Sequence, residues 1–257
     1  MLKKIHILLC ASLLLLALPP KLAGAADPQG GLDQAMVGAY RGMVEEHLAG
    51  VLNTVKALAA TEEVQSADWD RMKGALTEVG GRMPDATTLW FANPDGSYYT
   101  VQKGATGLNM SDRAYFPPLM AGKDVNDALV LGRSTGERQI IVGTPVMKDG
   151  KIVGAVGVAV SADKLSKLID ERLNLPANMV FFALDAQGQT ALHRDPKLIF
   201  QYPAQVGDVS LASAVREMLA APQGAAQYSF RGVPKTAYFQ KSATTGWVFA
   251  ISVPKGQ

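Results

Sequence analysis

The chain is poor in the side chains that perform covalent and metal chemistry. Its 257 residues include one cysteine, Cys10, and three histidines. One thiol cannot form an internal disulfide, and no histidine or cysteine cluster shows metal-ligand spacing. A P-loop and a G-x-G-x-x-G fingerprint are also absent from the sequence. We therefore expect no metal, no cofactor and no enzyme activity, and interpret His47 and His193 as structural or surface residues.

The chain also has little excess of charge of either sign. The 25 Lys and Arg residues against 23 Asp and Glu residues give a formal net charge of +2. That balance provides no basic surface for a phosphate backbone, so nucleic acid is not an expected partner. The 48% hydrophobic and 19% charged residues are typical of a globular protein with one large core or two small ones.

No apolar run reaches the roughly 20 residues that span a bilayer. The longest run, from Ile7 to Leu18, follows Lys3 and Lys4 and precedes the small residues at 23–26. This is the pattern of a secretory signal peptide. We predict that residues 1–26 are a cleaved signal peptide, with an uncleaved anchor as the less favoured alternative. In a bacterium with two membranes the product would be periplasmic.

Apolar residues recur every three or four positions between residues 32 and 60, which predicts a long amphipathic helix, assigned to residues 27–62. Such a helix is long enough to run beside two stacked modules. The alternative is two shorter helices broken near Gly50. The Met and Val stripe of the helix also suggests a homodimer, because it exceeds what one sheet covers.

The residues that follow show strand and turn signals. We expect hairpins at 87–101, with a turn at Asn93 to Gly96, and at 139–160, with a tight turn at Asp149-Gly150. A helix should begin after Ser161 as its N-cap and stop before Pro176.

The second half repeats this pattern in weaker form. Residues 180–192 echo the first hairpin, and residues 232–253 echo the second. Two copies of one antiparallel α+β unit, about 90 residues apart, suit the length better than one large domain. We assign the first module to 63–173 and the second, smaller one to 174–257.

Three segments in this order carry a resemblance to a known family. They are S-D-R-A-Y-F within Leu108 to Gly122, the hairpin from Pro145 to Gly157, and T-T-G-W-V at Thr244 to Val248. With the layout of residues 30–256 they resemble the double Cache (dCache, PAS-like) sensor domains of bacterial chemoreceptors and histidine kinases. The resemblance implies an α+β fold in which a long N-terminal helix supports two PAS-like modules, each a mainly antiparallel sheet flanked by helices. It also implies that the membrane-distal module, here 63–173, holds a small ligand.

Receptors of that family continue into a membrane helix and an output domain, whereas this sequence stops a few residues past the second module. The expectation is a stand-alone periplasmic sensor that reports its ligand state to a membrane histidine kinase or chemoreceptor. Two alternatives stay open: the solute-binding subunit of a transporter, and a protein-interaction module without a small ligand.

Arg113 is the first candidate for ligand binding, because a guanidinium offers a planar fork of donors to a carboxylate. The resemblance implies that it lines the pocket together with the aromatic position at Tyr115, whose hydroxyl could donate to a ligand oxygen. The alternative is a surface ion pair between Arg113 and Asp112, which would contribute little to stability.

Hydroxyl groups near Arg113 complete the candidate site. Ser134 and Thr135 lie in a loop between strands, where ordinary turn chemistry is the alternative. Thr144 and Tyr99 are further candidates, although the sequence does not decide between Tyr98 and Tyr99 for the inward face.

One departure from the family pattern bears on the ligand. Amino-acid-binding members carry an Asp after the D-G hairpin to hold the ligand's ammonium, and the matching position here is Ala159. Position 108 is Leu108, where the fuller signature has Tyr. An unpaired ammonium in a pocket would be costly, so we expect a small organic carboxylate such as acetate, pyruvate, lactate or a C4-dicarboxylate.

Overall fold

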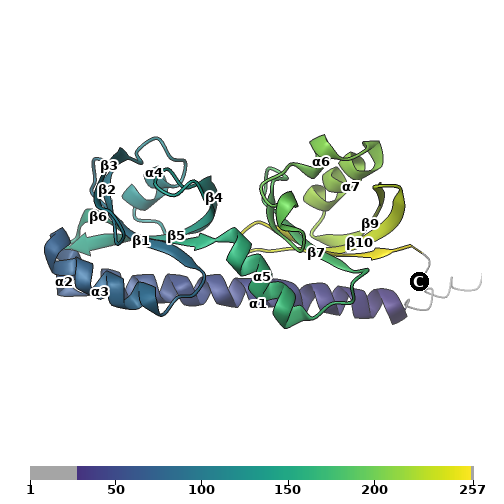
Figure 1. The fold of residues 1–257 in the computed structure, drawn as a ribbon, viewed down its shortest axis with the longest axis horizontal. Helices are drawn as coiled ribbons and strands as arrows, with labels where there is room; N and C mark the ends of the chain where they lie inside the picture. Colours follow the sequence, from purple (N-terminus) through teal and green to yellow (C-terminus); the bar gives the residue numbers. More distant parts are fainter. Residues whose placement is uncertain (1–27, 256–257) are drawn as a thin grey trace, which may run out of the picture.

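The computed structural model describes residues 28–255 and shows two antiparallel sheets side by side on one long helix (Figure 1). Helix α1 (Pro28–Ala59) is continuous through Gly50, so the alternative of two shorter helices is wrong. Its 32 residues extend about 48 Å. Within this range no helix has both the length and the apolar character needed to cross a membrane. The expected signal peptide lies outside the described residues.

One apolar stripe of α1 packs against one face of both sheets. Its members are spaced three or four residues apart and are at most 6% exposed: Val37, Tyr40, Val44, Leu48, Val51, Val55 and Leu58. They belong to one core cluster that includes residues of both sheets and of the adjoining helices. The chain's own modules therefore cover the stripe that suggested a homodimer.

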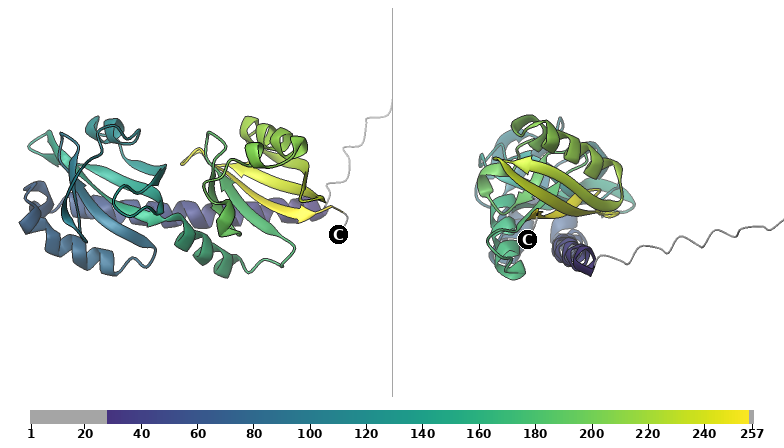
Figure 2. Two further views of the ribbon diagram at one scale, coloured as in Figure 1. Left: turned by 45° about the horizontal axis from the view of Figure 1, so that its top comes forward. Right: turned by 90° about the vertical axis from the view of Figure 1, so that its right-hand side faces the viewer.

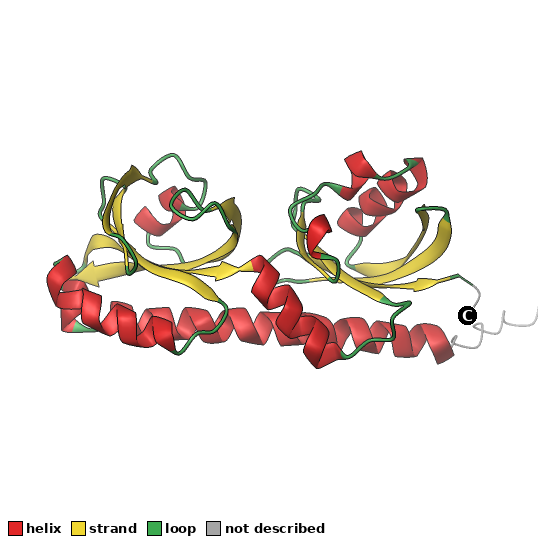
Figure 3. Ribbon diagram, in the orientation of Figure 1, coloured by secondary structure: helices red, strands yellow, loops and turns green. Residues whose placement is uncertain are grey.

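The first sheet has six antiparallel strands in the order β3-β2-β1-β6-β5-β4. They are β1 (Ala86–Ala92), β2 (Ser97–Thr100), β3 (Gly104–Asn109), β4 (Val125–Leu131), β5 (Arg138–Lys148) and β6 (Lys151–Ser161). Asp149 and Gly150, with φ of 50° and 74°, form the predicted tight turn between β5 and β6. Helices α2 (Glu62–Gln65) and α3 (Trp69–Gly81) lie on the α1 side, and α4 (Phe116–Met120) lies on the other face (Figure 3).

The second sheet has five antiparallel strands in the order β8-β7-β11-β10-β9. They are β7 (Val180–Leu184), β8 (Thr190–His193), β9 (Gln223–Phe230), β10 (Val233–Lys241) and β11 (Val248–Pro254). The end-on view of Figure 2 shows α1 on one side of this sheet and a covering layer on the other. That layer comprises the 3-10 turn η1 (Pro196–Leu198) and helices α6 (Pro203–Val206) and α7 (Val209–Ala220).

The two sheets share one topology. Without the extra edge strand β3, the order β2-β1-β6-β5-β4 matches β8-β7-β11-β10-β9 strand for strand. This agrees with the repeat seen in the sequence. Below, the first module means the six-stranded sheet with α3 and α4, and the second module means the five-stranded sheet with η1, α6 and α7.

Helix α5 (Ala162–Leu173) connects the two modules. Ser161 is its N-cap as predicted, and its hydroxyl accepts from the Lys164 N–H at 3.3 Å. The helix ends because Asn174 adopts the left-handed conformation, with φ of 45°. The helix thus stops before Pro176, as predicted.

Candidate functional site

The first module contains a cavity of about 40 Å³ on the sheet face opposite α1. Water needs about 10–15 Å³ of such space, so the cavity suits a ligand of only a few non-hydrogen atoms. Strands, the segment before α4 and the β4–β5 loop supply its walls: Thr88, Trp90, Tyr98, Thr100, Met110, Arg113, Tyr115, Val130, Leu131, Gly132, Arg133, Ser134, Gln139, Ile141 and Ala159. We call this the first-module cavity.

Arg113 reaches this cavity from a turn that precedes α4. Its backbone N–H donates to Met110 O at 2.9 Å, which fixes the turn. Its side-chain Nη2 donates to Leu131 O at 3.0 Å, at the end of β4. No carboxylate in the described part of the chain forms an ion pair with Arg113, because Asp112 pairs with Arg133 instead. The guanidinium therefore keeps donors available for a ligand.

Arg133 brings a second guanidinium to the same place from the β4–β5 loop. It donates to Asn109 O and to the carboxylate of Asp112, which clasps the loop to the segment before α4. The hydrogen bond from Arg133 also lowers the pKa of Asp112 below its usual value. The described cavity walls thus carry two arginines and no carboxylate, which favours an anionic ligand.

Two aromatic residues add neutral donors. Burial raises the pKa of Tyr115 to about 12, so its hydroxyl stays protonated. The indole N–H of Trp90 is buried, and no described residue accepts a hydrogen bond from it. The Trp90 ring lies 6.5 Å from the Tyr115 ring, centroid to centroid. Since an unpaired buried donor costs about 1–3 kcal/mol, a ligand oxygen that accepts from Trp90 would recover this energy.

The position of Trp90 depends on two glycines of the neighbouring strands. A Cβ at Gly157 would lie 2.7 Å from Trp90 Cε2, and one at Gly143 would lie 3.1 Å from its Cη2. Both are closer than real Cβ contacts normally come. The absence of side chains at these positions of β5 and β6 makes room for the indole.

The sequence-predicted residues divide into two groups. Arg113, Tyr115 and Ser134 meet at the first-module cavity. Thr135 lies just outside, where its hydroxyl accepts from Gln139 Nε2 at 2.9 Å. Thr144 is buried elsewhere and donates to Asp124 Oδ1 at 2.7 Å.

The structure also decides between the two tyrosines of β2. Tyr98 lines the first-module cavity. Tyr99 points to the opposite face and stacks on Trp69 of α3, with ring centroids 5.0 Å apart. Alternate residues of a strand face opposite sides of the sheet. The prediction that Tyr99 lines the site is therefore off by one position.

Sequence reasoning did not single out Trp90, Arg133 or Gln139 as site residues. A usable signal was present for Trp90, because Gly143 and Gly157 lie in neighbouring strands and leave space for a large ring. Arg133 and Gln139 carried no such signal, since a loop arginine and a strand glutamine are common in any sheet protein.

Residues 33–257 match the family model described as Cache domain. The chain belongs to the Cache domain family. Its fold is similar to the ligand-binding domain of the Pseudomonas aeruginosa PAO1 amino acid chemoreceptor PctB, solved with L-Arg, with a TM-score of 0.72 and 16% identity over 89% of each chain. It is also similar to the sensor domain of the Vibrio cholerae histidine kinase DctB, with a TM-score of 0.68, 14% identity, and coverage of 90% of this chain and 98% of that one.

A curated relative gives a sequence match over part of this Cache domain protein. The methyl-accepting chemotaxis protein PscA of Pseudomonas syringae pv. tomato is 26% identical over 137 residues. The match covers 50% of this chain and 21% of PscA. The aligned half of the chain therefore corresponds to about a fifth of that receptor.

Ala159 of this Cache domain lies in the cavity wall, at the position where the family pattern suggested an acid. It is 2% exposed and pairs with Ile141 of β5 and Thr88 of β1. A methyl group at this place cannot hold an ammonium. The described wall therefore supplies two guanidinium groups and no carboxylate to pair with an amine.

Proposed function

We propose that the chain is a periplasmic sensor module that binds a small organic carboxylate in the first-module cavity. It would pass its ligand state to a membrane-bound histidine kinase or chemoreceptor. The observation that supports this most directly is the meeting of Arg113 and Arg133 at a cavity whose described walls contain no acid. The family and the fold support the sensor role.

The size of the cavity supports a small ligand. A volume of about 40 Å³ accommodates a carboxylate with a short tail, such as acetate or pyruvate, more readily than an amino acid with a long side chain. PctB holds L-Arg, whereas an α-ammonium here would meet Ala159 and lose its water without a charged partner.

The proposal is binding without catalysis. The ionisable side chains of the described cavity wall are arginines and tyrosines. Arginine is permanently charged, and Tyr115 has its pKa raised to about 12. None of these arginines, nor Tyr115, exchanges a proton readily near neutral pH, which general acid–base catalysis requires.

Calorimetry with propanoate and L-alanine tests the ligand class, because the two differ by the ammonium alone. We expect propanoate to bind and L-alanine to bind at least about tenfold more weakly, as loss of one charged partner costs more than about 1.4 kcal/mol. Arg113→Ala should abolish propanoate binding. Arg82→Ala, which removes an exposed arginine paired with Glu78, serves as the matched control.

A thermal-shift screen gives the broader test. Acetate, pyruvate, lactate and amino acids at 100 times the dissociation constant should each add about 2.7 kcal/mol if they bind. For a chain of this length that is about 5–10 °C. Tighter binding of L-alanine than of propanoate would overturn the carboxylate assignment. If no compound shifts the melting temperature, a protein-interaction module is favoured instead.

The homodimer through α1 is a separable part of the proposal. The exposed side of α1 presents Ala35, Ala39, Glu46 and Asn53, and these small or polar residues leave that side accessible to a second copy. Sedimentation velocity of the purified protein tests this idea, and a monomer at all concentrations would remove it.

A further inference from the structure

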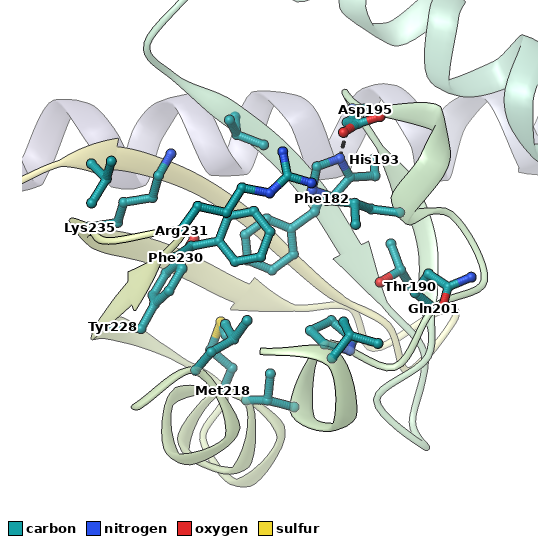
Figure 4. Close-up of a pocket in the computed structure, with 17 residues that line it drawn as sticks. Phe182, Thr190, His193, Asp195, Gln201, Met218, Tyr228, Phe230, Arg231 and Lys235 are labelled. Carbon is teal, nitrogen blue, oxygen red and sulfur yellow. Dashed lines mark hydrogen bonds between the residues drawn. The ribbon is translucent and has the colours of Figure 1, made fainter. Parts of the chain in front are cut away.

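The second module contains a much larger cavity, of about 320 Å³, that the function above does not use (Figure 4). It lies between the sheet and the layer formed by α6 and α7. This volume falls within the range of about 300–1,000 Å³ that is typical of small-molecule sites. We call it the second-module cavity.

Most of its wall is apolar. Strands β7 and β9 contribute Phe182, Tyr228 and Phe230, and α7 contributes Val215 and Met218. Phe182, Val215 and Met218 are at most 7% exposed. Such a wall suits a hydrocarbon chain or ring, whose burial gains about 25 cal/mol per Å².

One end of the second-module cavity carries two cations, Arg231 and Lys235. The described residues form no ion pair or hydrogen bond with either side chain; Arg231 instead lies over the Phe230 ring, 5.1 Å from its centroid. Burial lowers the pKa of Lys235 from its usual value. Two unpaired cations beside an apolar wall provide a place for an anion.

Arg231 occupies a turn position that favours other residues. It joins β9 to β10 in a two-residue turn with Gly232, and both have positive φ, 52° and 78°. Asn-Gly is the preferred pair for such a turn, and a left-handed conformation costs roughly 1–2 kcal/mol for other L-residues. The geometry of the hairpin therefore does not explain why residue 231 is an arginine, whereas a role for positive charge at the cavity does.

His193 adds a neutral donor to the same cavity. Its Nδ1 accepts from the Asp195 N–H at 2.8 Å. Burial, and to a smaller extent Lys235 and Arg231, lower the pKa of His193 to about 4, so the ring is neutral and carries its proton on Nε2. No hydrogen bond to Nε2 is formed by the residues that the structure describes.

Asp195 is the acid of the described cavity wall. Its Oδ1 already accepts from the Lys197 N–H at 3.0 Å, where it caps η1. The charged side chains at the cavity are then Arg231, Lys235 and this capping carboxylate. Their sum is positive.

We propose that the second-module cavity is a second ligand site, and that it takes a carboxylate with an apolar body, such as an aromatic acid. The carboxylate would lie at Arg231 and Lys235, and the hydrocarbon between α7 and the sheet. This site is independent of the first-module cavity and does not rest on the function proposed for it.

Calorimetry with 3-phenylpropanoate and its neutral amide tests the ligand class. We expect the acid to bind at least tenfold more tightly than the amide. Arg231→Asn should weaken the acid at least tenfold and leave the protein folded, because Asn-Gly suits the turn. Lys235→Gln should act in the same direction. Arg216→Gln, on the exposed side of α7, is the matched control and should change nothing.

Methionine methyl NMR locates the binding. Met218 lines the second-module cavity and Met110 lines the first-module cavity. The proposal requires that 3-phenylpropanoate shifts the Met218 signal and spares that of Met110, with and without Arg113→Ala. Equal binding of acid and amide, a response confined to Met110, or no binding at millimolar concentration would overturn it.

Discussion

His47 of α1 and Asp85 lie 2.6 Å apart, Nε2 to Oδ2, and this contact ties the long helix to the residue that precedes β1. Asp85 O also accepts from the Ser161 N–H at 2.8 Å, at the end of β6. Burial raises the pKa of Asp85, but the hydrogen bond and charge of His47 outweigh it and the net pKa is lowered. The pair thus fixes where the first module lies along α1.

Replacing His47 by Ala should reduce the free energy of unfolding by about 1–3 kcal/mol, because it leaves the buried Asp85 carboxylate without its partner. Because the pKa of Asp85 is lower in the native state than in the unfolded chain, its carboxylate stabilises the fold at pH values above the usual Asp pKa. This contribution is lost as the pH falls through the native pKa. The deficit that comes from Asp85 should therefore be complete above the usual Asp pKa and shrink as the pH falls below it. Urea unfolding at several pH values measures it, with Arg82→Ala as a control that changes stability by less than about 0.5 kcal/mol.

The lowered pKa of His193 leads to a second loss of stability as the pH falls. Its pKa is about 4 in the native state and about 6.5 when unfolded, so only the unfolded chain takes up the proton between these values. Its contribution is complete above pH 6.5 and is lost as pH falls toward 4. Between pH 7 and pH 5, His193→Gln should lose about 2 kcal/mol less stability than the parent protein. Parallel pH profiles for both proteins would contradict the buried neutral imidazole.

Gly157 and Gly42 form a matched pair of glycine-to-alanine tests. A Cβ at Gly157 would collide with the Trp90 ring and come within 2.5 Å of Val142 O. Gly157→Ala should destabilise the protein by about 1–3 kcal/mol and weaken ligand binding through the displaced indole. A Cβ at Gly42, inside α1, would meet no described atom within 4 Å apart from its chain neighbours and the helix backbone, so Gly42→Ala should stabilise by about 0.5–1 kcal/mol. Urea unfolding of both variants checks the opposite signs.

Arg138 connects the two modules. From β5 it donates to Asp163 at the start of α5 and, across the module boundary, to Pro196 O at 2.9 Å and Ile199 O at 3.1 Å. Arg138→Ala should lower the free energy of unfolding by about 2 kcal/mol, since it removes several charge-assisted hydrogen bonds. Arg138→Lys should recover less than half of that, because an ammonium lacks the planar fork. Full recovery by lysine would show that charge alone matters.

Local signals were sufficient for much of the fold. The Asp149-Gly150 turn and the Ser161 N-cap are as the sequence predicts, since both depend on residues adjacent in the chain. The predicted α+β architecture on one long helix is confirmed. Helix α7 and strand β9 were not predicted, although α7 has an N-cap at Asp208 and buried residues spaced three or four positions apart.

The site was predictable in part for the same reason. Arg113 and Tyr115 are close in the chain, and the family resemblance drew attention to both. The choice between Tyr98 and Tyr99 depends on which face of β2 meets α3, and Thr144 depends on the position of Asp124, 20 residues away. Neither relationship leaves a mark in the local sequence.

The sequence by itself determined the helix, the hairpins and the repeat, because periodicity and turn residues act over a few residues, and it singled out Arg113 as a candidate. The tertiary structure alone decided which side chains face each cavity, and that the larger cavity lies in the second module. Its wall is assembled from β7, β8, β9, β10, η1, α6 and α7, and how far a helix stands from a sheet is set by the packing of the whole layer.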